Sequence, residues 1–204
     1  MYREHEYYLR RAIEVSRESR KAGNTPFGAL LVDADGEIVM EQPNVEITEH
    51  ICTGHAETTL AARASHKFTK DYLWNCTLYS TAEPCAMCSG AIYWANIGHV
   101  VYGMTEKRLL ELTGSNEQNP TFSLPCREVF ARGQKDIKVE GPFPEIEEEA
   151  AEVHKGYWYY KRLAEARLFH YISERYASME SAQDANAAES KTFEKPHSVR
   201  ASSK

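Results

Sequence analysis

Two cysteines lie three residues apart in the stretch AEPCAMCSGAIYWANIG, residues 82–98. Cys85 follows Pro84, and a run typical of a helix begins at the two thiols. A helix N-terminus favours thiolate, which is the form of cysteine that binds metal. Thiolate and imidazole suit zinc, and a catalytic zinc keeps three protein ligands and one open position. We therefore expect a histidine ligand, with a carboxylate beside it, at another helix start.

The stretch His55-Ala56-Glu57 meets that expectation, because it opens a second expected helix thirty residues before Cys85. One expected strand separates the two helices, so their N-termini can face the same edge of a sheet. We predict that His55, Cys85 and Cys88 hold one zinc ion and that Glu57 is not a ligand. Zinc would lower the pKa of water, and Glu57 would move protons from that water to a ring nitrogen and to a leaving amine. This pattern is the signature described for zinc nucleobase deaminases.

Each half of the pattern has a simpler interpretation when it stands alone. A lone CxxC pair is often a structural zinc site or a redox pair, and His-Ala-Glu occurs by chance. The five cysteines are an odd number in a chain without a secretion signal, which disfavours a disulfide framework. Cys52 lies three residues before His55, but a fourth protein ligand would close the open position. Cys76 and Cys126 are interpreted as ordinary buried thiols.

The composition limits the partners of the protein. The formal net charge is −6, whereas nucleic-acid binders usually carry a basic patch. The local basic clusters fall in amphipathic helical patterns, where a solvated helix face explains them. No apolar run is long enough for a membrane span, and the start MYREHEYYLRR is too charged for a secretion signal. We therefore expect a cytoplasmic location and no membrane partner.

The pattern of expected elements is that of an α/β protein with a mixed sheet of about five strands. An amphipathic helix is followed by a hairpin around the turn at 33–36, and strands then alternate with helices. The expected helices span 4–22, 55–66, 85–96 and 106–112, with a helical turn or two at 127–133. The expected strands span 29–32, 38–40, 75–81, 99–104 and 135–141.

The C-terminal part has a different character. A proline and a run of acids near 142–150 suit a helix N-terminus, and the helical pattern continues past Gly156. After about Ser178 few large apolar residues remain, which is typical of disorder. We therefore predict a deaminase core at 1–142, a helical extension at 143–177 and a disordered tail at 178–204.

The chain resembles the cytidine-deaminase-like superfamily over about residues 5–160, and is most similar to the branch of guanine deaminases and tRNA adenosine deaminases. The resemblance implies a three-layer fold, and it is carried by His55-Ala-Glu57, by Pro84-Cys-Ala-Met-Cys88 and by "TPFGALLV". It also implies five contacts with the substrate. They would come from Phe27, Asn44, Ala56, Glu83 and Trp94, with Asn44 hydrogen-bonding the base and Trp94 stacking near it. Without the resemblance, we would interpret Asn44 as a turn residue and Trp94 as a core residue.

The resemblance implies a purine base such as guanine as the substrate, and a homodimer. Guanine deaminases carry a second acid that reads the base, and in the nearest stretch here, TGSNEQNP, Glu117 could replace it. The alternatives are adenosine in tRNA, which the net charge disfavours, and small amines such as guanosine, cytosine, pterins or triazines. A zinc-stabilised binding subunit is the alternative outside enzymes, and the presence of Glu57 argues against it.

Overall fold

The computed structural model describes residues 4–114 and 119–159 of the chain. The chain divides into two compact units, Met1–Lys155 and Gly156–Lys204, and every element named below belongs to the first. Glu117 lies outside the described residues, as do the predicted tail at 178–204 and residues 160–177 of the predicted extension. The predicted boundaries at 142 and 177 therefore stay predictions. No helix in the described ranges is long and apolar enough to cross a membrane.

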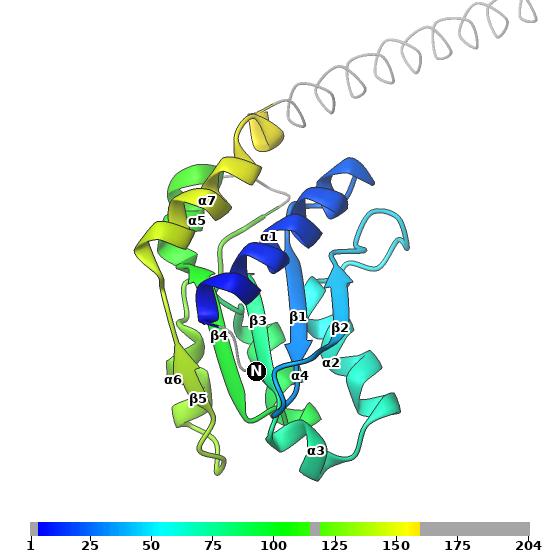
Figure 1. The fold of residues 1–204 in the computed structure, drawn as a ribbon. Coiled ribbons are helices and arrows are strands. Elements are labelled where there is room, and N and C mark those ends of the chain that lie inside the picture. The colour runs from blue at the N-terminus through cyan, green and yellow to red at the C-terminus, as the bar shows by residue number, and fades with distance from the viewer. Residues whose placement is uncertain (1–3, 115–118, 160–204) are drawn as a thin grey trace, which may run out of the picture. The chain divides into compact units, whose positions relative to one another are not determined.

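A five-stranded mixed sheet forms the middle layer and confirms the predicted fold class. The strands lie in the order β2-β1-β3-β4-β5 (Figure 1). The hairpin partners β1 and β2 are antiparallel, β1 is also antiparallel to β3, and β3, β4 and β5 are parallel. Their bounds are β1 Gly28–Val32, β2 Ile38–Pro43, β3 Thr77–Ala82, β4 His99–Met104 and β5 Lys138–Glu140.

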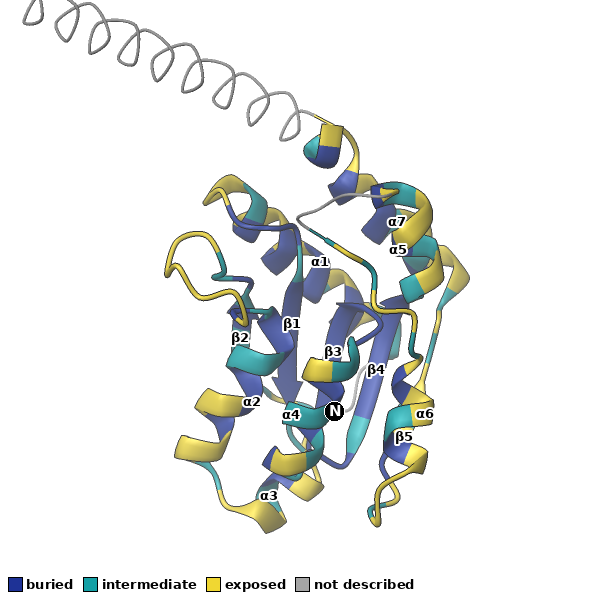
Figure 2. Ribbon diagram, turned by 180° about the vertical axis from the view of Figure 1, so that it is seen from behind, coloured by how far each residue is buried: buried dark blue, intermediate teal, exposed yellow. Residues whose placement is uncertain are grey.

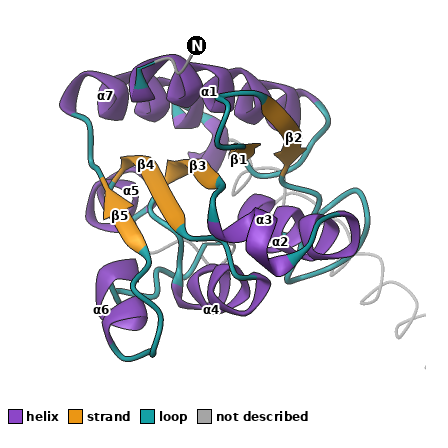
Figure 3. Ribbon diagram, turned by 60° about the horizontal axis from the view of Figure 1, so that its bottom comes forward, coloured by secondary structure: helices purple, strands orange, loops and turns teal. Residues whose placement is uncertain are grey.

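Helices cover both faces of this sheet, as predicted (Figure 3). One face carries α1 and α7, whose apolar side chains form one core cluster with the strand residues that point to this face. The opposite face carries α2, α3, α4 and α6, which build the second cluster. Thr105 precedes α5, which contacts α7. The bounds are α1 His5–Lys21, α2 Ala56–Lys67, α3 Lys70–Trp74, α4 Ala86–Ala95, α5 Glu106–Thr113, α6 Cys126–Ala131 and α7 Pro144–His154.

The central strands are buried on both faces, as Figure 2 shows for β1, β3 and β4. Strands covered by helices on both sides are typically apolar throughout, which explains the run Ala29 to Val32. Gly28 allows α1 to come close to β1, because a Cβ at this position would lie 2.6 Å from the carbonyl oxygen of Ala12. The physical role of Gly28 is therefore this close helix–strand approach.

The strand directions bring three chain segments to one edge of the sheet. β3 and β4 are parallel, so both carboxyl ends lie at this edge, and the Glu83 N–H donates to the Met104 carbonyl at 2.7 Å. β1 runs the other way and begins there, directly after Phe27. Ligands of α/β proteins bind outside the carboxyl ends of parallel strands. This edge is therefore where a site is expected.

The one-turn helix α3 is the element that the sequence did not predict. It spans five residues from Lys70, and the side chain of its N-cap Thr69 accepts a hydrogen bond from the Tyr72 N–H. Five residues are too few for a helical apolar period to show in a sequence.

Candidate active site

The three predicted zinc ligands meet at this edge. The Nδ1 atom of His55 lies 3.8 Å from the Cys85 sulfur and 3.6 Å from the Cys88 sulfur. All three ligand atoms lie within 4.8 Å of one another, and no other His, Cys, Asp or Glu group of this kind is found in the described ranges. With the zinc–nitrogen and zinc–sulfur lengths of tetrahedral sites, two ligand atoms are roughly 3.6 Å apart. The donor set therefore fits zinc with one open position.

Two helix starts position these ligands. His55 is the N-cap of α2 and Cys85 is the N-cap of α4, both with extended backbone, and Cys88 lies in the first turn of α4. The positive end of each helix dipole favours a thiolate here. A hydrogen bond from Cys88 and another with His55 lower the pKa of Cys85 to about 4, against the effect of burial. The hydrogen bond with Cys85 raises the pKa of His55 to about 9.

The carboxylate of Glu57 is buried beside the ligands. Its Oε1 atom accepts a hydrogen bond of 2.9 Å from the Ser80 hydroxyl, and its Oε2 atom lies 3.5 Å from the Cys88 sulfur. Burial raises the pKa of Glu57, so the carboxyl group can hold a proton and pass it on. The sequence did not single out Ser80, whose only signal was a hydroxyl inside a buried strand.

A cavity of about 440 Å³ opens onto the ligands. His55, Glu57 and Cys85 lie in its wall, and of the five expected substrate contacts Phe27 and Glu83 also line it. The sequence missed most of the remaining wall. The missed residues include Glu46, Glu106, Leu109, Asn119 and Phe122.

Glu83 has a structural use that its sequence position did not reveal. Its buried carboxylate accepts the Cys126 N–H through Oε1 at 3.1 Å and the Glu106 N–H through Oε2 at 3.3 Å. One side chain thus joins the first residues of α5 and α6 to the turn that carries Cys85. Both oxygens of Glu83 already accept protein hydrogen bonds. The expected contact of Glu83 with a substrate stays a prediction.

Asn44 and Ala56 are buried and do not line the cavity. The Asn44 side chain accepts the Glu46 N–H at 2.9 Å, which is an Asx turn, and its amide donates to the Glu46 carboxylate at 3.3 Å. The turn interpretation of Asn44 therefore agrees with the structure, and its contact with a base stays a prediction. Ala56 forms the first turn of α2 between His55 and Glu57.

Trp94 does not lie in the cavity. It is nine residues beyond Cys85 on α4, roughly 13 Å along a helix axis, and 77% of its surface is exposed. Its ring contacts Tyr93 edge-on at 5.4 Å between centroids. The stacking role that the resemblance implied for Trp94 has no support from the described cavity, because the helix carries the ring away from the site.

Two other residues of the wall, Cys52 and Glu106, carry ionisable side chains. Cys52 is exposed and lines the cavity without joining the group of three ligand atoms, and all five cysteines are free thiols. Glu106 directly follows the N-cap of α5 after β4, a position at a strand's carboxyl end that could have marked it. Burial, followed by the negative groups of Cys85, Glu83 and Glu57, raises the pKa of Glu106 to about 7.

Comparison with known proteins agrees with this geometry. Residues 2–104 match the family model for the cytidine and deoxycytidylate deaminase zinc-binding region. A probable cytosine deaminase of Schizosaccharomyces pombe is 38% identical over 151 residues, which cover 74% of this chain and 90% of the yeast protein. A guanine deaminase of Bacillus subtilis is 42% identical over 99 residues, covering 48% of this chain and 63% of that protein.

Solved structures share the fold. A guanine deaminase from Nitrosomonas europaea superposes with a TM-score of 0.61 at 22% identity, covering 77% of this chain and 85% of that one. A structure from a study of tRNA:A34 deaminases superposes with a TM-score of 0.57 at 24% identity, covering 72% and 98%. These two superpositions show that the arrangement of helices and strands is shared.

Proposed function

The chain belongs to the family of cytidine and deoxycytidylate deaminases, and from this premise we propose that it removes the exocyclic amine of a free purine base such as guanine. Hydrolytic, zinc-dependent deamination is the chemistry of this family. The observation that carries the proposal is a buried Glu57 beside the three candidate zinc-ligating atoms, with Glu57, His55 and Cys85 in the wall of one cavity.

His55, Cys85 and Cys88 would hold the zinc ion. When bound, zinc lowers the pKa of water and makes hydroxide available near neutral pH. Glu57 would accept a proton from the attacking water and deliver it to the ring nitrogen beside the amino-bearing carbon. It would then carry a second proton to the leaving amine, so that ammonia departs and a carbonyl remains on the ring. Ser80 holds Glu57 in place for both transfers.

The cavity supports a free base over a nucleotide in tRNA. Three carboxylates besides Glu57 line it, those of Glu46, Glu83 and Glu106. Together with the net charge of −6, they would repel the phosphates that dominate binding of nucleic acids. Phe27, Leu109 and Phe122 add apolar surface suited to a flat ring.

Cytosine is the second candidate substrate. The probable cytosine deaminase of Schizosaccharomyces pombe matches along 90% of its own length, whereas the guanine deaminase of Bacillus subtilis matches along 63%. The higher identity belongs to the guanine enzyme, at 42% against 38%. The two relatives therefore support different bases, and the choice requires a direct measurement.

Assembly as a homodimer is part of the proposal. α4 presents apolar side chains to solvent, with Met87 37% and Trp94 77% exposed. A second copy that covers this face would remove the exposed apolar surface from water. Light scattering of the full chain at several concentrations tests the dimer.

Ammonia release from the zinc-loaded full chain tests the activity. The substrates to compare are guanine, guanosine, adenine, adenosine, cytosine, cytidine, a pterin, an aminotriazine and a tRNA anticodon stem-loop. Guanine turnover that falls roughly 10²–10⁴-fold in Glu57→Gln would support both the base and the mechanism. Turnover of cytosine or tRNA instead would overturn the guanine assignment. Undiminished turnover in Glu57→Gln would overturn the role of Glu57.

A further inference from the structure

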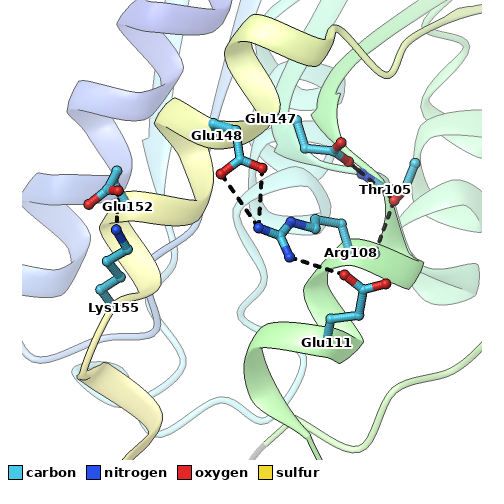
Figure 4. A network of polar contacts seen from close by, with 7 residues as sticks. All are labelled: Thr105, Arg108, Glu111, Glu147, Glu148, Glu152 and Lys155. Atoms are coloured by element: carbon cyan, nitrogen blue, oxygen red, sulfur yellow. Dashed lines mark hydrogen bonds and ion pairs between the residues drawn. The ribbon is translucent and has the colours of Figure 1, made fainter.

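Two segments of the cavity wall lie outside the elements that carry the zinc ligands, and the first is α5 with Glu106. Contacts with α7 hold this segment (Figure 4). Glu147 of α7 accepts a hydrogen bond from the Thr105 N–H at 3.2 Å, directly before α5. Arg108 of α5 pairs with Glu148 of α7 at 3.1 Å. A neighbouring helix thus braces this segment of the wall.

The second segment is the loop at 44–54, which connects β2 to α2. Three of its side chains line the cavity, those of Glu46, Ile47 and Cys52. The Val45 N–H donates to the Gly54 carbonyl at 2.9 Å and closes the base of the loop. The loop contains no helix or strand, so its other backbone N–H groups need partners of a different kind.

The side chain of Asn24 supplies such partners. Its Oδ1 atom accepts hydrogen bonds from the Ile47 N–H at 2.9 Å and from the Thr48 N–H at 3.0 Å. Its Nδ2 atom donates to the Thr48 hydroxyl at 3.0 Å, and Asn24 is buried. One side chain therefore holds two consecutive loop residues, directly beside the wall residue Glu46.

The end of α1 fixes the position of Asn24 in turn. The Gly23 N–H donates to the Arg20 carbonyl and the Asn24 N–H donates to the Ser19 carbonyl, both at 3.1 Å. With Gly23 at a φ of 94°, this is a Schellman motif, in which glycine takes the left-handed position. The Ser19 hydroxyl also donates to the Asn44 carbonyl at 3.3 Å, where the loop begins. The loop is thus attached to a helix that packs on the sheet.

We infer that Asn24 is a positioning residue for substrate binding, which orders the loop at 44–54 before a substrate enters the cavity and thereby lowers KM. A wall that is already ordered loses little conformational freedom on binding. The role of Asn24 rests on the proposed function only for the substrate, because order in the loop is a property of the free protein. His55 should keep its place without Asn24, since its carbonyl accepts the Thr59 N–H at 2.9 Å.

Hydrogen–deuterium exchange of the zinc-loaded full chain tests the order of the loop in wild type, Asn24→Ala, Asn24→Asp and Asn75→Ala. In Asn24→Ala, Ile47 and Thr48 lose the acceptor for their N–H groups, so the peptide that contains them should exchange roughly 10-fold faster. Asn24→Asp keeps a carboxylate acceptor and should keep slow exchange. Asn75→Ala removes an exposed asparagine whose side chain makes a hydrogen bond outside the cavity, and should leave this peptide unchanged.

Steady-state kinetics of the same four proteins, with the base that is turned over fastest, tests the effect on binding. Asn24→Ala should raise KM by roughly 10-fold, with kcat within roughly threefold of wild type and zinc content unchanged. The retained kcat follows because Glu57 and Ser80 lie on other elements. Asn24→Asp should restore the low KM. A loss of stability alone would lower the folded fraction, and hence kcat, without raising KM.

Unchanged exchange in Asn24→Ala would overturn the role of Asn24 whatever the activity. Faster exchange with an unchanged KM would overturn it as well, because the order of the loop would then have no effect on binding. If no base is turned over, the proposed function fails, and the exchange measurement alone decides whether Asn24 orders the wall. If Asn24→Ala does not fold, Asn24→Ser gives the same comparison, because its shorter side chain withdraws the amide oxygen from the loop.

Discussion

The two sides of the cavity are built in different ways. The metal side consists of His55, Glu57, Ser80, Cys85 and Cys88, which lie on β3 and on the first turns of α2 and α4. Its polar atoms contact one another at hydrogen-bond distances. The rest of the wall includes Glu106 and Leu109 of α5 and the loop residues Asn119 and Phe122, of which Phe122 is 60% exposed. The candidate metal ligands are thus held by packed elements, whereas the rest of the wall includes an exposed loop side chain.

The largest effect is expected from losing a ligand on the metal side. Cys88→Ala leaves two protein ligands, so zinc affinity should fall by more than a hundredfold and turnover of every substrate should fall with it. Metal content by atomic absorption and kcat/KM on two bases measure the change. Cys76→Ala, a buried thiol outside the cavity, is the matched control. Full zinc content and activity in Cys88→Ala would remove Cys88 from the site.

A smaller effect on the same side is expected from Ser80→Ala. The substitution deletes the hydrogen bond of 2.9 Å to Glu57, so kcat should fall by roughly 10-fold with zinc content unchanged. Because Glu57 serves every substrate, the loss should be equal for guanine and cytosine or for any pair that is turned over. Ser65→Ala on the exposed face of α2 is the control. A loss that differs between substrates would instead show that Ser80 affects substrate binding through the cavity wall.

Glu83→Gln tests the connection between the two sides. The amide cannot accept both the Cys126 and the Glu106 N–H, so one buried donor loses its partner at a cost of about 1–3 kcal/mol. The wall should shift while the ligands stay, raising KM several-fold more than it lowers kcat and leaving zinc content unchanged. Steady-state kinetics and urea unfolding measure both changes. Lost zinc with an unchanged KM would show that Glu83 serves the ligands alone.

The smallest effect concerns His154, whose ring lies 5.1 Å from that of the wall residue Phe27. Burial, with a smaller effect of Arg20, lowers the pKa of His154 to about 3. Below the unfolded pKa of about 6.5 the unfolded chain binds a proton that the folded chain does not, so stability falls as the pH drops. Between pH 6.5 and pH 5 this amounts to about 2 kcal/mol and should disappear in His154→Gln.

Urea unfolding at pH 7 and pH 5 measures that difference. Protonation of the zinc ligands affects both proteins alike and cancels when the two are compared. Equal losses of stability in wild type and His154→Gln would show that His154 is not buried as a neutral ring.

The elements of the fold could be predicted where local pattern decides them. The helix at 5–21, the hairpin and the strand at 99–104 follow from apolar periodicity and turn residues. The helix α3 could not be predicted, because one turn held by a threonine cap has no period. The side chain of Glu83 could not be assigned either, since its partners at 106 and 126 are distant in sequence.

The sequence alone determined the chemistry of this protein, because ligand type, spacing and helix starts are local properties of His55-Ala-Glu57 and Pro84-Cys-Ala-Met-Cys88. Only the tertiary structure decided which side chains line the cavity beside the ligands. It brought Glu106 and Asn119 to the cavity, and it placed Trp94 on the far end of α4. The physical reason is that parallel strands bring the ends of distant segments to one sheet edge, whereas a helix carries residues near in sequence away from that edge at 1.5 Å per residue.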